Sequence, residues 1–485
     1  MAAGIISVGV YVPYYRLKRE VMARAWERRP LKGERSVANT DEDSLTMAVE
    51  AARSAMTTGG AHQAQGLNRE GIEALYFASL SAPYAEKSQA GLIATVCDLP
   101  ERLVTTDLAQ CTRAGTSGLL AALSAVNSGL ARRALVTAAD TRQGYPKSDH
   151  EQLLGDAGAA VIVGQENVAA ELEATVSINA EIIDIWRNYG EKYLNSGESR
   201  FIFEKGYLAA MTRVVKAILD KTGLAPNQIS KAVFSTPGLR EDQQLGKKLG
   251  FSEEQIQDSL MLQVGDCGTA QPLLLLAAAL ETAKAGDRIL LAAYGQGADA
   301  FIFKVTEEIV NIRQAAQVQK ALETKRYLES YSRYLSFRGL LETVPGEPFR
   351  TFPSNSGYWR DQKGILRLTG SRCRVCGSGI FPINRICHKC GAKDQFDEIG
   401  LSDRKAKVFT YSIDNLAGRG DDPVVVQTVA EDLEGFRYYL LMTDFDQAEV
   451  KVDQEVEFTF RKIYEGGNYI NYYWKCRPAR KRGDA

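Results

Sequence analysis

The sequence predicts a duplicated α/β domain followed by a four-cysteine metal ribbon and a small all-β barrel. Three observations support this fold class. Short β-branched strands alternate with helices up to about residue 310, four cysteines cluster between residues 373 and 390, and five strand-like segments follow that cluster. Alternating strands and helices are typical of layered α/β domains. A length of 485 residues also indicates more than one domain, since single cores rarely exceed about 250–300 residues.

The α/β region begins with a β-branched segment at residues 5–12, which ends at Pro13. The Asn-Thr-Asp sequence at residues 39–41 is predicted to cap a helix, with Glu42 and Asp43 in the acidic first turn of that helix. Further short strands are expected at residues 75–78, 134–138, 159–163, 232–235, 289–293 and 301–305.

An internal repeat relates residues 103–140 to residues 260–295. Each copy opens on a predicted strand, reaches a cysteine (Cys111 or Cys267), passes a Gly-Thr pair and continues through an alanine- and leucine-rich helix into another strand. A glycine-rich turn and a further strand follow each copy. Repeats of this kind indicate structural duplication. We therefore interpret the region as two similar halves with a central site between them.

The chain changes character after residue 310. Residues 311–341 place apolar side chains on one face of a charged helix and are interpreted as a connector, whereas the proline- and aromatic-rich residues 345–365 are expected to form an ordered loop. The region beyond residue 408 suits a closed barrel of the OB type. Its strands are expected at residues 408–413, 424–429, 438–443, 456–464 and 469–475. The predicted boundaries are 1–165 and 166–310 for the halves, 311–365 for the connector and loop, 366–397 for the ribbon and 398–480 for the barrel.

The cysteine cluster has the spacing Cys-x2-Cys, ten residues, Cys-x2-Cys. Each pair places two thiolates on one tight turn, and two such turns complete a tetrahedron around zinc. An iron site of the rubredoxin type is the alternative. Four protein ligands leave no open position, so the ion is predicted to be structural. The predicted ligands are Cys373, Cys376, Cys387 and Cys390.

Composition narrows the remaining function classes. A formal net charge of −1 gives no general electrostatic reason to bind nucleic acid or an anionic membrane, and we read the basic end of the chain at residues 475–482 as a solvated terminus. The longest purely apolar run, residues 273–280, is far shorter than the roughly 20 residues of a spanning helix. No export signal is recognised, and the cysteines do not suggest a disulfide framework. We therefore expect a cytoplasmic protein.

Cys111 is the strongest candidate for chemistry. It lies between a predicted strand and a predicted helix, where the positive end of the helix dipole favours a thiolate. A thiolate can accept an acyl group from a thioester. The backbone N–H of Cys111 and that of Gly297, in the glycine-rich turn of the other half, are predicted to form an oxyanion hole. On spacing alone, a buried structural cysteine remains the alternative.

Six segments of the α/β region carry a family resemblance: residues 4–26, 39–56, 139–141, 186–193, 247–251 and 285–291. Through these segments, residues 1 to about 310 resemble the archaeal-type hydroxymethylglutaryl-CoA synthase family of the thiolase superfamily. The resemblance implies a five-layer thiolase-like fold, a coenzyme A thioester substrate, acylation of Cys111 and assembly into at least a dimer. Residues from about 357 to 480 resemble the zinc-ribbon and OB-fold proteins that partner thiolases and such synthases.

Three positions depart from the pattern of that family. Leu80 stands where the family has its acid/base glutamate, Ser235 where it has a histidine, and Asp266 where it has an asparagine. A leucine side chain cannot remove a proton from the methyl group of an acetyl thioester. His62 and His150 lie in polar segments and are expected to be solvated. Of the catalytic residues of the family, this sequence therefore retains only the nucleophile, Cys111.

Other residues are candidates for the missing acid/base. Cys267 is the repeat-mate of Cys111 and is predicted to approach it across the central site. Asp266 would act as a base if burial raised its pKa. Tyr294 is a third candidate, and Ser235 a hydrogen-bonding one.

Four functions follow from these predictions. The preferred one is a thiolase-like enzyme that makes or cleaves carbon–carbon bonds in acyl-CoA substrates through acyl-Cys111. The second is hydroxymethylglutaryl-CoA synthase itself. The third is a non-catalytic acyl-CoA-binding or channelling subunit that works with a separate thiolase. The fourth, a nucleic-acid binder, rests only on the ribbon, barrel and basic tail.

Overall fold

The computed structural model describes residues 3–58, 69–315, 317–341, 353–418 and 424–480. The chain divides into two compact units. Residues 1–38 and 43–334 form the first unit, and residues 39–42 and 335–485 form the second, which we call the barrel unit. Among the described residues, no helix is long and apolar enough to cross a bilayer.

The first unit is built on a nine-stranded sheet in the order β11-β12-β13-β8-β1-β7-β6-β4-β5. The sheet consists of two half-sheets, joined where β1 pairs with β8. The strands of the first half are β1 (Gly4–Tyr11), β4 (Ile72–Ala78), β5 (Val104–Leu108), β6 (Arg133–Asp140) and β7 (Ala157–Gly164). Those of the second are β8 (Ala170–Asn179), β11 (Lys231–Phe234), β12 (Arg288–Tyr294) and β13 (Gly297–Val305).

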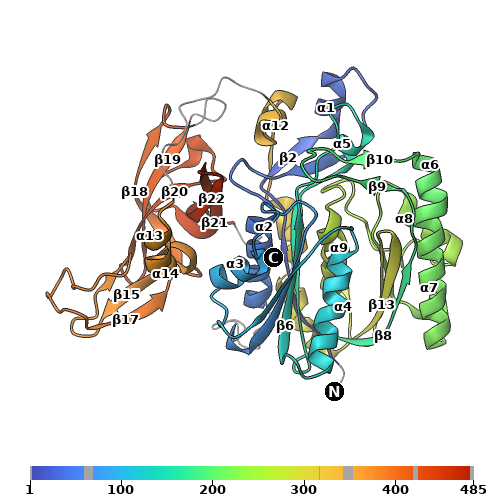
Figure 1. The fold of residues 1–485 in the computed structure, drawn as a ribbon, viewed down its shortest axis with the longest axis horizontal. Helices are drawn as coiled ribbons and strands as arrows, with labels where there is room; N and C mark the ends of the chain where they lie inside the picture. Colours follow the sequence, from blue (N-terminus) through green and yellow to red (C-terminus); the bar gives the residue numbers. More distant parts are fainter. Residues whose placement is uncertain (1–2, 59–68, 316, 342–352, 419–423, 481–485) are drawn as a thin grey trace. The chain divides into compact units, whose positions relative to one another are not determined.

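Helices complete a five-layer arrangement within this unit (Figure 1). Helix α2 (Ser44–Thr58) packs on the outer face of the first half-sheet, and α7 (Leu208–Thr222) and α8 (Glu241–Leu249) cover the second. Helices α4 (Ala114–Asn127) and α9 (Gln271–Thr282) form the central layer. Helix α9 is apolar on nearly all sides, as expected of a helix buried between two sheets. The thiolase-like α/β fold is therefore confirmed.

The two half-sheets repeat one another. The order β5-β4-β6-β7-β1 of the first half matches β11-β12-β13-β8 of the second, and α3 (Gln89–Val96) corresponds to α8. One strand is missing from the second copy. The predicted strand at residue 260 is not formed, and only an isolated bridge between Ala232 and Ile256 occupies that edge. The duplication seen in the sequence is thus a duplication of topology.

The cap predicted for the first long helix is wrong by several residues. Helix α2 begins at Ser44, and Asp43 caps it: Thr46 N–H donates to Asp43 Oδ1 at 2.9 Å, while Asp43 N–H donates to Thr46 Oγ1 at 2.9 Å. This reciprocal pair is a capping box. Residues 39–41 precede the helix and belong to the barrel unit. Their polar side chains have other partners there.

The connector is not one helix. It consists of α10 (Val310–Ala315), α11 (Gln317–Glu323), β14 (Arg326–Tyr327) and α12 (Tyr331–Phe337). Strand β14 joins β2 (Tyr15–Lys18) and β3 (Glu34–Val37) in a small sheet. Residues 353–365 also differ from the predicted loop, since they contain α13 (Asn355–Arg360) and part of α14 (Gln362–Arg367); residues 345–352 lie outside the described residues. The remaining short elements are α1 (Arg19–Ala25), α5 (Asp149–Leu153), α6 (Ser199–Phe201), β9 (Ile185–Trp186) and β10 (Asn195–Ser196).

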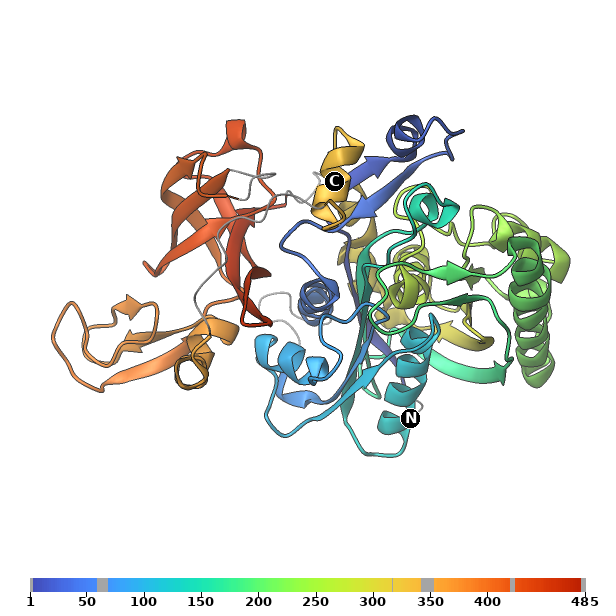
Figure 2. The same ribbon diagram turned by 45° about the horizontal axis from the view of Figure 1, so that its top comes forward.

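The barrel unit contains a three-stranded sheet and a closed five-stranded barrel (Figure 2). The small sheet is formed by β15 (Thr369–Cys373), β16 (Gly379–Ile380) and β17 (Phe396–Gly400). Burial alternates along β19, as expected where one face of each strand lines the barrel interior. The barrel strands are β18 (Lys405–Asp414), β19 (Val425–Asp432), β20 (Arg437–Met442), β21 (Glu455–Gly466) and β22 (Tyr469–Pro478). The five predicted strands are confirmed, and the OB classification stays a prediction.

Candidate active site

A cavity of about 650 Å³ opens within the first unit. Both halves contribute to its wall, so it lies at the centre of the duplication. The lining residues used below are Leu80, Cys111 and Arg142 from the first half, and Asp184, Ser235, Asp266, Tyr294, Gly295 and Gln296 from the second.

Cys111 lies in the turn between β5 and α4, three residues before the first residue of that helix. The carbonyl of Cys111 accepts a hydrogen bond from Ala114 N–H at 3.0 Å. The side chain is partly exposed and lines the cavity. The sulfur therefore lies near the N-terminus of a 14-residue helix, where the helix dipole is positive.

The glycine-rich turn after β12 packs directly against the Cys111 turn. Thr112 Oγ1 donates to Tyr294 O at 2.8 Å, and Arg113 Nε donates to Gly295 O at 3.0 Å. A Cβ atom at position 295 would lie only 2.7 Å from Arg113 N, so glycine is required at this contact. Gly295 and Gln296 line the cavity, but the predicted oxyanion-hole donor Gly297 does not.

Two buried carboxylates hold the halves together around the cavity. Asp299 on β13 accepts hydrogen bonds from Thr116 Oγ1 at 2.7 Å and from the Arg113 guanidinium at 3.1 Å. Asp140 at the end of β6 accepts from Thr269 Oγ1 at 2.9 Å and from Leu80 N–H at 2.6 Å. In each case a threonine of one half donates to a carboxylate of the other. Sequence reasoning assigned neither aspartate a role, because their partners are far away along the chain.

The three positions that depart from the family pattern all line the cavity. Leu80 provides no proton-accepting group. Ser235 Oγ accepts a hydrogen bond from Tyr294 N–H at 3.1 Å, which holds the end of β12. Asp266 Oδ2 lies 2.6 Å from the Arg142 guanidinium, and its Oδ1 accepts from Gly268 N–H at 2.9 Å. Both oxygens of Asp266 therefore have partners.

Cys267 does not share the cavity with Cys111. Its side chain is fully buried within the core formed by β1, α4 and α9, and it is not among the lining residues. Burial, followed by the nearby Asp266 carboxylate, raises the pKa of the Cys267 thiol well above its usual value. The thiol therefore stays protonated, and it lies in the core instead of on the cavity wall.

Tyr294 forms a second polar group on the cavity wall. Its hydroxyl donates to Asp184 Oδ2 at 2.9 Å, and Gln296 Nε2 donates to Asp184 Oδ1 at 3.3 Å. Burial and the Asp184 carboxylate raise the pKa of Tyr294, so the phenol remains protonated. Asp184 was missed from the sequence, although it comes just before the Trp186–Tyr193 segment that resembles the family.

The predicted solvation of the histidines finds no support at His150. This residue lies in α5 and is partly buried, and burial followed by the nearby Arg142 charge lowers its pKa. It does not line the cavity. His62 lies outside the described residues.

The four cysteines of the ribbon converge in the barrel unit. Their sulfur atoms all lie within 4.8 Å of one another. The two turns repeat the same geometry, since Gly377 N–H donates to Cys373 O and Gly391 N–H donates to Cys387 O, both at 2.9 Å. These glycines have φ angles of +72° and +74°, which favour glycine. Four soft thiolate donors at this spacing fit a tetrahedral zinc ion.

Comparison with solved structures supports the class of the fold. The chain is similar to an MvaS in complex with 3-hydroxy-3-methylglutaryl coenzyme A, at 20% identity and a TM-score of 0.63 over 73% of this chain and 95% of that one. It is also similar to the 3-oxoacyl-[acyl-carrier-protein] synthase III of Aquifex aeolicus, at 22% identity and a TM-score of 0.53 over 62% of this chain and 100% of that one. Residues 219–304 match the family model of the C-terminal part of 3-oxoacyl-[acyl-carrier-protein] synthase III. These similarities show that the chain has the fold of these synthases.

Curated relatives identify the family within that class. The chain is 35% identical over 350 residues to the hydroxymethylglutaryl-CoA synthase of Methanothermobacter thermautotrophicus, covering 70% of this chain and 99% of the relative. It is 34% identical over 355 residues to that of Pyrobaculum arsenaticum, with shares of 70% and 99%. The chain belongs to the hydroxymethylglutaryl-CoA synthase family, whose members are acyltransferases of the thiolase superfamily.

Proposed function

We propose that this protein makes or cleaves carbon–carbon bonds in CoA thioesters through an acyl group carried on Cys111. The observation that carries the proposal is the position of Cys111, partly exposed on the cavity wall at the N-terminus of the central helix α4. CoA as part of the substrate is supported by the relatives named hydroxymethylglutaryl-CoA synthase and by a similar solved structure described as complexed with CoA.

The proposed first step is acyl transfer. The Cys111 thiolate attacks the thioester carbonyl, and collapse of the tetrahedral intermediate expels the CoA thiolate and leaves acyl-Cys111. Donors to the developing oxyanion are Cys111 N–H and the peptide N–H of Gln296, which replaces Gly297 because only Gly295 and Gln296 of this turn line the cavity. An α-carbanion of a second thioester then attacks the acyl group. The cleavage direction runs through the same intermediates in reverse.

The proton at the α-carbon needs a group other than residue 80. We assign this role to the pair of Tyr294 and Asp184, which lines the cavity and is joined by a hydrogen bond from the Tyr294 hydroxyl. In the cleavage direction, Tyr294 would protonate the departing α-carbanion. Ser235 and Asp266 are proposed to position the cavity wall through their existing hydrogen bonds.

Intact-protein mass spectrometry tests this proposal. Wild-type protein is incubated with a panel of acyl-CoAs and β-ketoacyl-CoAs, and the adduct mass and CoA products are measured. An adduct that is lost in Cys111→Ala and kept in Cys97→Ala supports acyl transfer at Cys111; Cys97 is a matched control because it is buried and does not line the cavity. No adduct with any thioester would exclude both enzymatic functions and leave the acyl-CoA-binding subunit.

A second candidate is hydroxymethylglutaryl-CoA synthase. The names of the curated relatives favour it, and Leu80 opposes it. The two functions differ in their products. A hydroxymethylglutaryl-CoA synthase converts acetyl-CoA, acetoacetyl-CoA and water into hydroxymethylglutaryl-CoA and free CoA. A thiolase given the same thioesters forms no hydroxymethylglutaryl-CoA. Chromatographic identification of the product distinguishes them.

We also propose that the ribbon cysteines bind one structural zinc ion. The ion would hold the two turns together and perform no chemistry, because four thiolates fill its coordination sphere. Metal analysis should find one zinc per chain, and Cys376→Ser should lose it while Cys97→Ser keeps it. Assembly into at least a dimer is proposed from the family alone, with sedimentation velocity as its test.

A further inference from the structure

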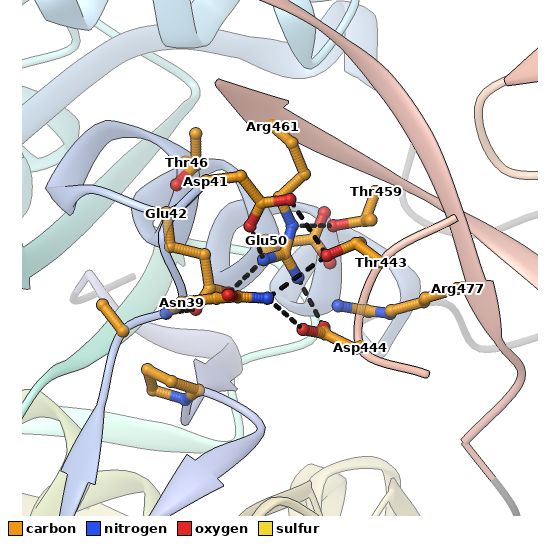
Figure 3. A network of polar contacts seen from close by, with 12 residues as sticks. Asn39, Asp41, Glu42, Thr46, Glu50, Thr443, Asp444, Thr459, Arg461 and Arg477 are labelled. Atoms are coloured by element: carbon orange, nitrogen blue, oxygen red, sulfur yellow. Dashed lines mark hydrogen bonds and ion pairs between the residues drawn. The ribbon is translucent and has the colours of Figure 1, made fainter. Parts of the chain in front are cut away.

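Arg461 lies at the centre of a buried polar network in the barrel unit (Figure 3). Its guanidinium is fully buried and faces three carboxylates. NH1 lies 3.0 Å from Asp41 Oδ1 and 2.7 Å from Glu42 Oε1, and NH2 lies 2.7 Å from Asp444 Oδ2. Buried charges require such pairing, because removal from water is costly.

Strands β21 and β22, together with Thr443 just after β20, hold the same short segment, residues 39–42. Thr443 Oγ1 donates to Asp41 Oδ2 at 2.9 Å, and Lys475 Nζ lies 2.8 Å from the same oxygen. Lys462 N–H donates to Asp41 O at 3.0 Å. The segment is thus fixed through both its side chains and its backbone, which explains why it belongs to the barrel unit although residues 38 and 43 do not.

The residues that follow this segment lead to the cavity wall. Two positions after Glu42, the hydroxyl of Ser44 is fully buried at the first residue of α2 and donates to Ser81 O at 3.0 Å. Ser81 Oγ in turn donates to Asp140 Oδ1 at 2.8 Å. Leu80, the residue before Ser81, lines the cavity.

We propose that Arg461 is a positioning residue for the active site. By fixing residues 39–42, it fixes the first residue of α2, and through the Ser44–Ser81 hydrogen bond it sets the position of the loop that contains Leu80. The inference rests on the proposed acyl-transfer function for its kinetic readout. It goes beyond that function because it assigns a role to the C-terminal barrel through the covalent continuity of residues 42–44.

A double-mutant cycle between Arg461→Gln and Ser44→Ala tests the proposal. Each change should lower kcat about tenfold with KM changed less than about twofold, because the loop is misplaced and substrate contacts remain. The double variant should be no slower than the slower single variant, since both changes interrupt one connection. Arg437→Gln is the matched control, because Arg437 pairs with Glu431 on the exposed surface of the same barrel. The proposal is overturned if the losses of kcat in the two single variants multiply in the double variant. It is also overturned if Arg461→Gln keeps both the wild-type kcat and the wild-type metal content.

Two additions keep the test decisive. If Arg461→Gln does not fold, Glu42→Gln replaces it, since that change removes one charge and keeps the shape of the side chain. If wild-type protein forms no acyl adduct, the proposed function fails, and hydrogen–deuterium exchange of the peptide that contains residues 79–81 decides instead. Faster exchange there in the Arg461 or Glu42 variant, but not in Arg437→Gln, supports the positioning role, and unchanged exchange refutes it.

Discussion

The two halves of the first unit share a topology but place their cysteines differently. In the first half, Cys111 precedes the Gly115-Thr116 pair by four residues and lines the cavity; in the second, Cys267 is adjacent to the Gly268-Thr269 pair and is fully buried. The Gly-Thr pairs themselves meet near the centre, since a Cβ at Gly115 would lie 2.1 Å from Thr269 O. The three additional residues before Gly115 therefore accompany the position of Cys111 on the cavity wall, whereas Cys267 lies in the core.

The largest expected effect comes from substituting each of these two cysteines by alanine. Cys111→Ala should lower turnover by a factor on the order of 10⁴ or more, because it removes the nucleophile. Cys267→Ala should keep turnover within about twofold and cost about 1–2 kcal/mol of unfolding free energy, as expected for removing a small buried side chain. Steady-state rates and denaturant titrations measure both. Loss of turnover in a stably folded Cys267→Ala would restore that thiol to the mechanism.

The next largest effect is expected at the buried carboxylates that hold the two halves together. Asp299→Asn leaves Arg113, whose side chain is 17% exposed, without its carboxylate partner. Losing a buried charge partner costs about 3 kcal/mol, so the free energy of unfolding should fall by that amount. The exposed pair of Arg132 and Glu73 is the control, and Glu73→Gln should change stability by less than about 0.5 kcal/mol. Equal losses of stability in Asp299→Asn and Glu73→Gln would show that the Asp299 carboxylate does not hold the halves together.

The second half also contains a buried acid away from the cavity. Burial raises the pKa of Asp242 on α8 from 3.8 to about 6. The folded state holds this proton more tightly than the unfolded state does. The contribution of Asp242 to the free energy of unfolding should therefore be greatest below pH 4 and should fall as the pH rises through 6. Asp242→Asn should therefore gain about 2 kcal/mol over wild type at pH 8 and nothing at pH 4. Thermal unfolding at both pH values measures the difference; a gain independent of pH would show that Asp242 is not the titrating group.

The smallest expected effect is a gain of function. Leu80→Glu places a carboxylate where the family resemblance puts its acid/base, on the wall of the cavity that Cys111 also lines. If the missing carboxylate alone prevents the synthase reaction, the rate of hydroxymethylglutaryl-CoA formation should rise about tenfold. This is a fraction of the rate increase that an optimised base contributes. Leu80→Gln, of similar size and without basicity, should show no rise. Equal rates in both variants would mean that the rest of the cavity is specialised for another reaction.

Local patterns predicted much of this molecule. Most strands of the first unit, the duplication and the five barrel strands follow from alternation and periodicity, although β8 was not predicted; the convergence of Cys373 and Cys390 follows from their spacing. The errors have a common cause. Whether Cys267 lines the cavity, or whether residues 39–41 cap a helix, depends on contacts with residues more than 100 positions away, and a local pattern contains no information about them. Asp184 was missed for the same reason, since Tyr294 approaches it only in the folded chain.

The network around Arg461 also bears on the order in which the chain folds. Asp41 and Arg461 are 420 positions apart, so the partner of Asp41 leaves the ribosome on the order of tens of seconds after it, at typical elongation rates. Until then residues 39–42 lack their barrel partners, although the start of α2 can already form its capping box and the Ser44–Ser81 hydrogen bond. Nascent chains that end before β21 should therefore expose this turn to proteases, whereas the completed protein should resist cleavage there.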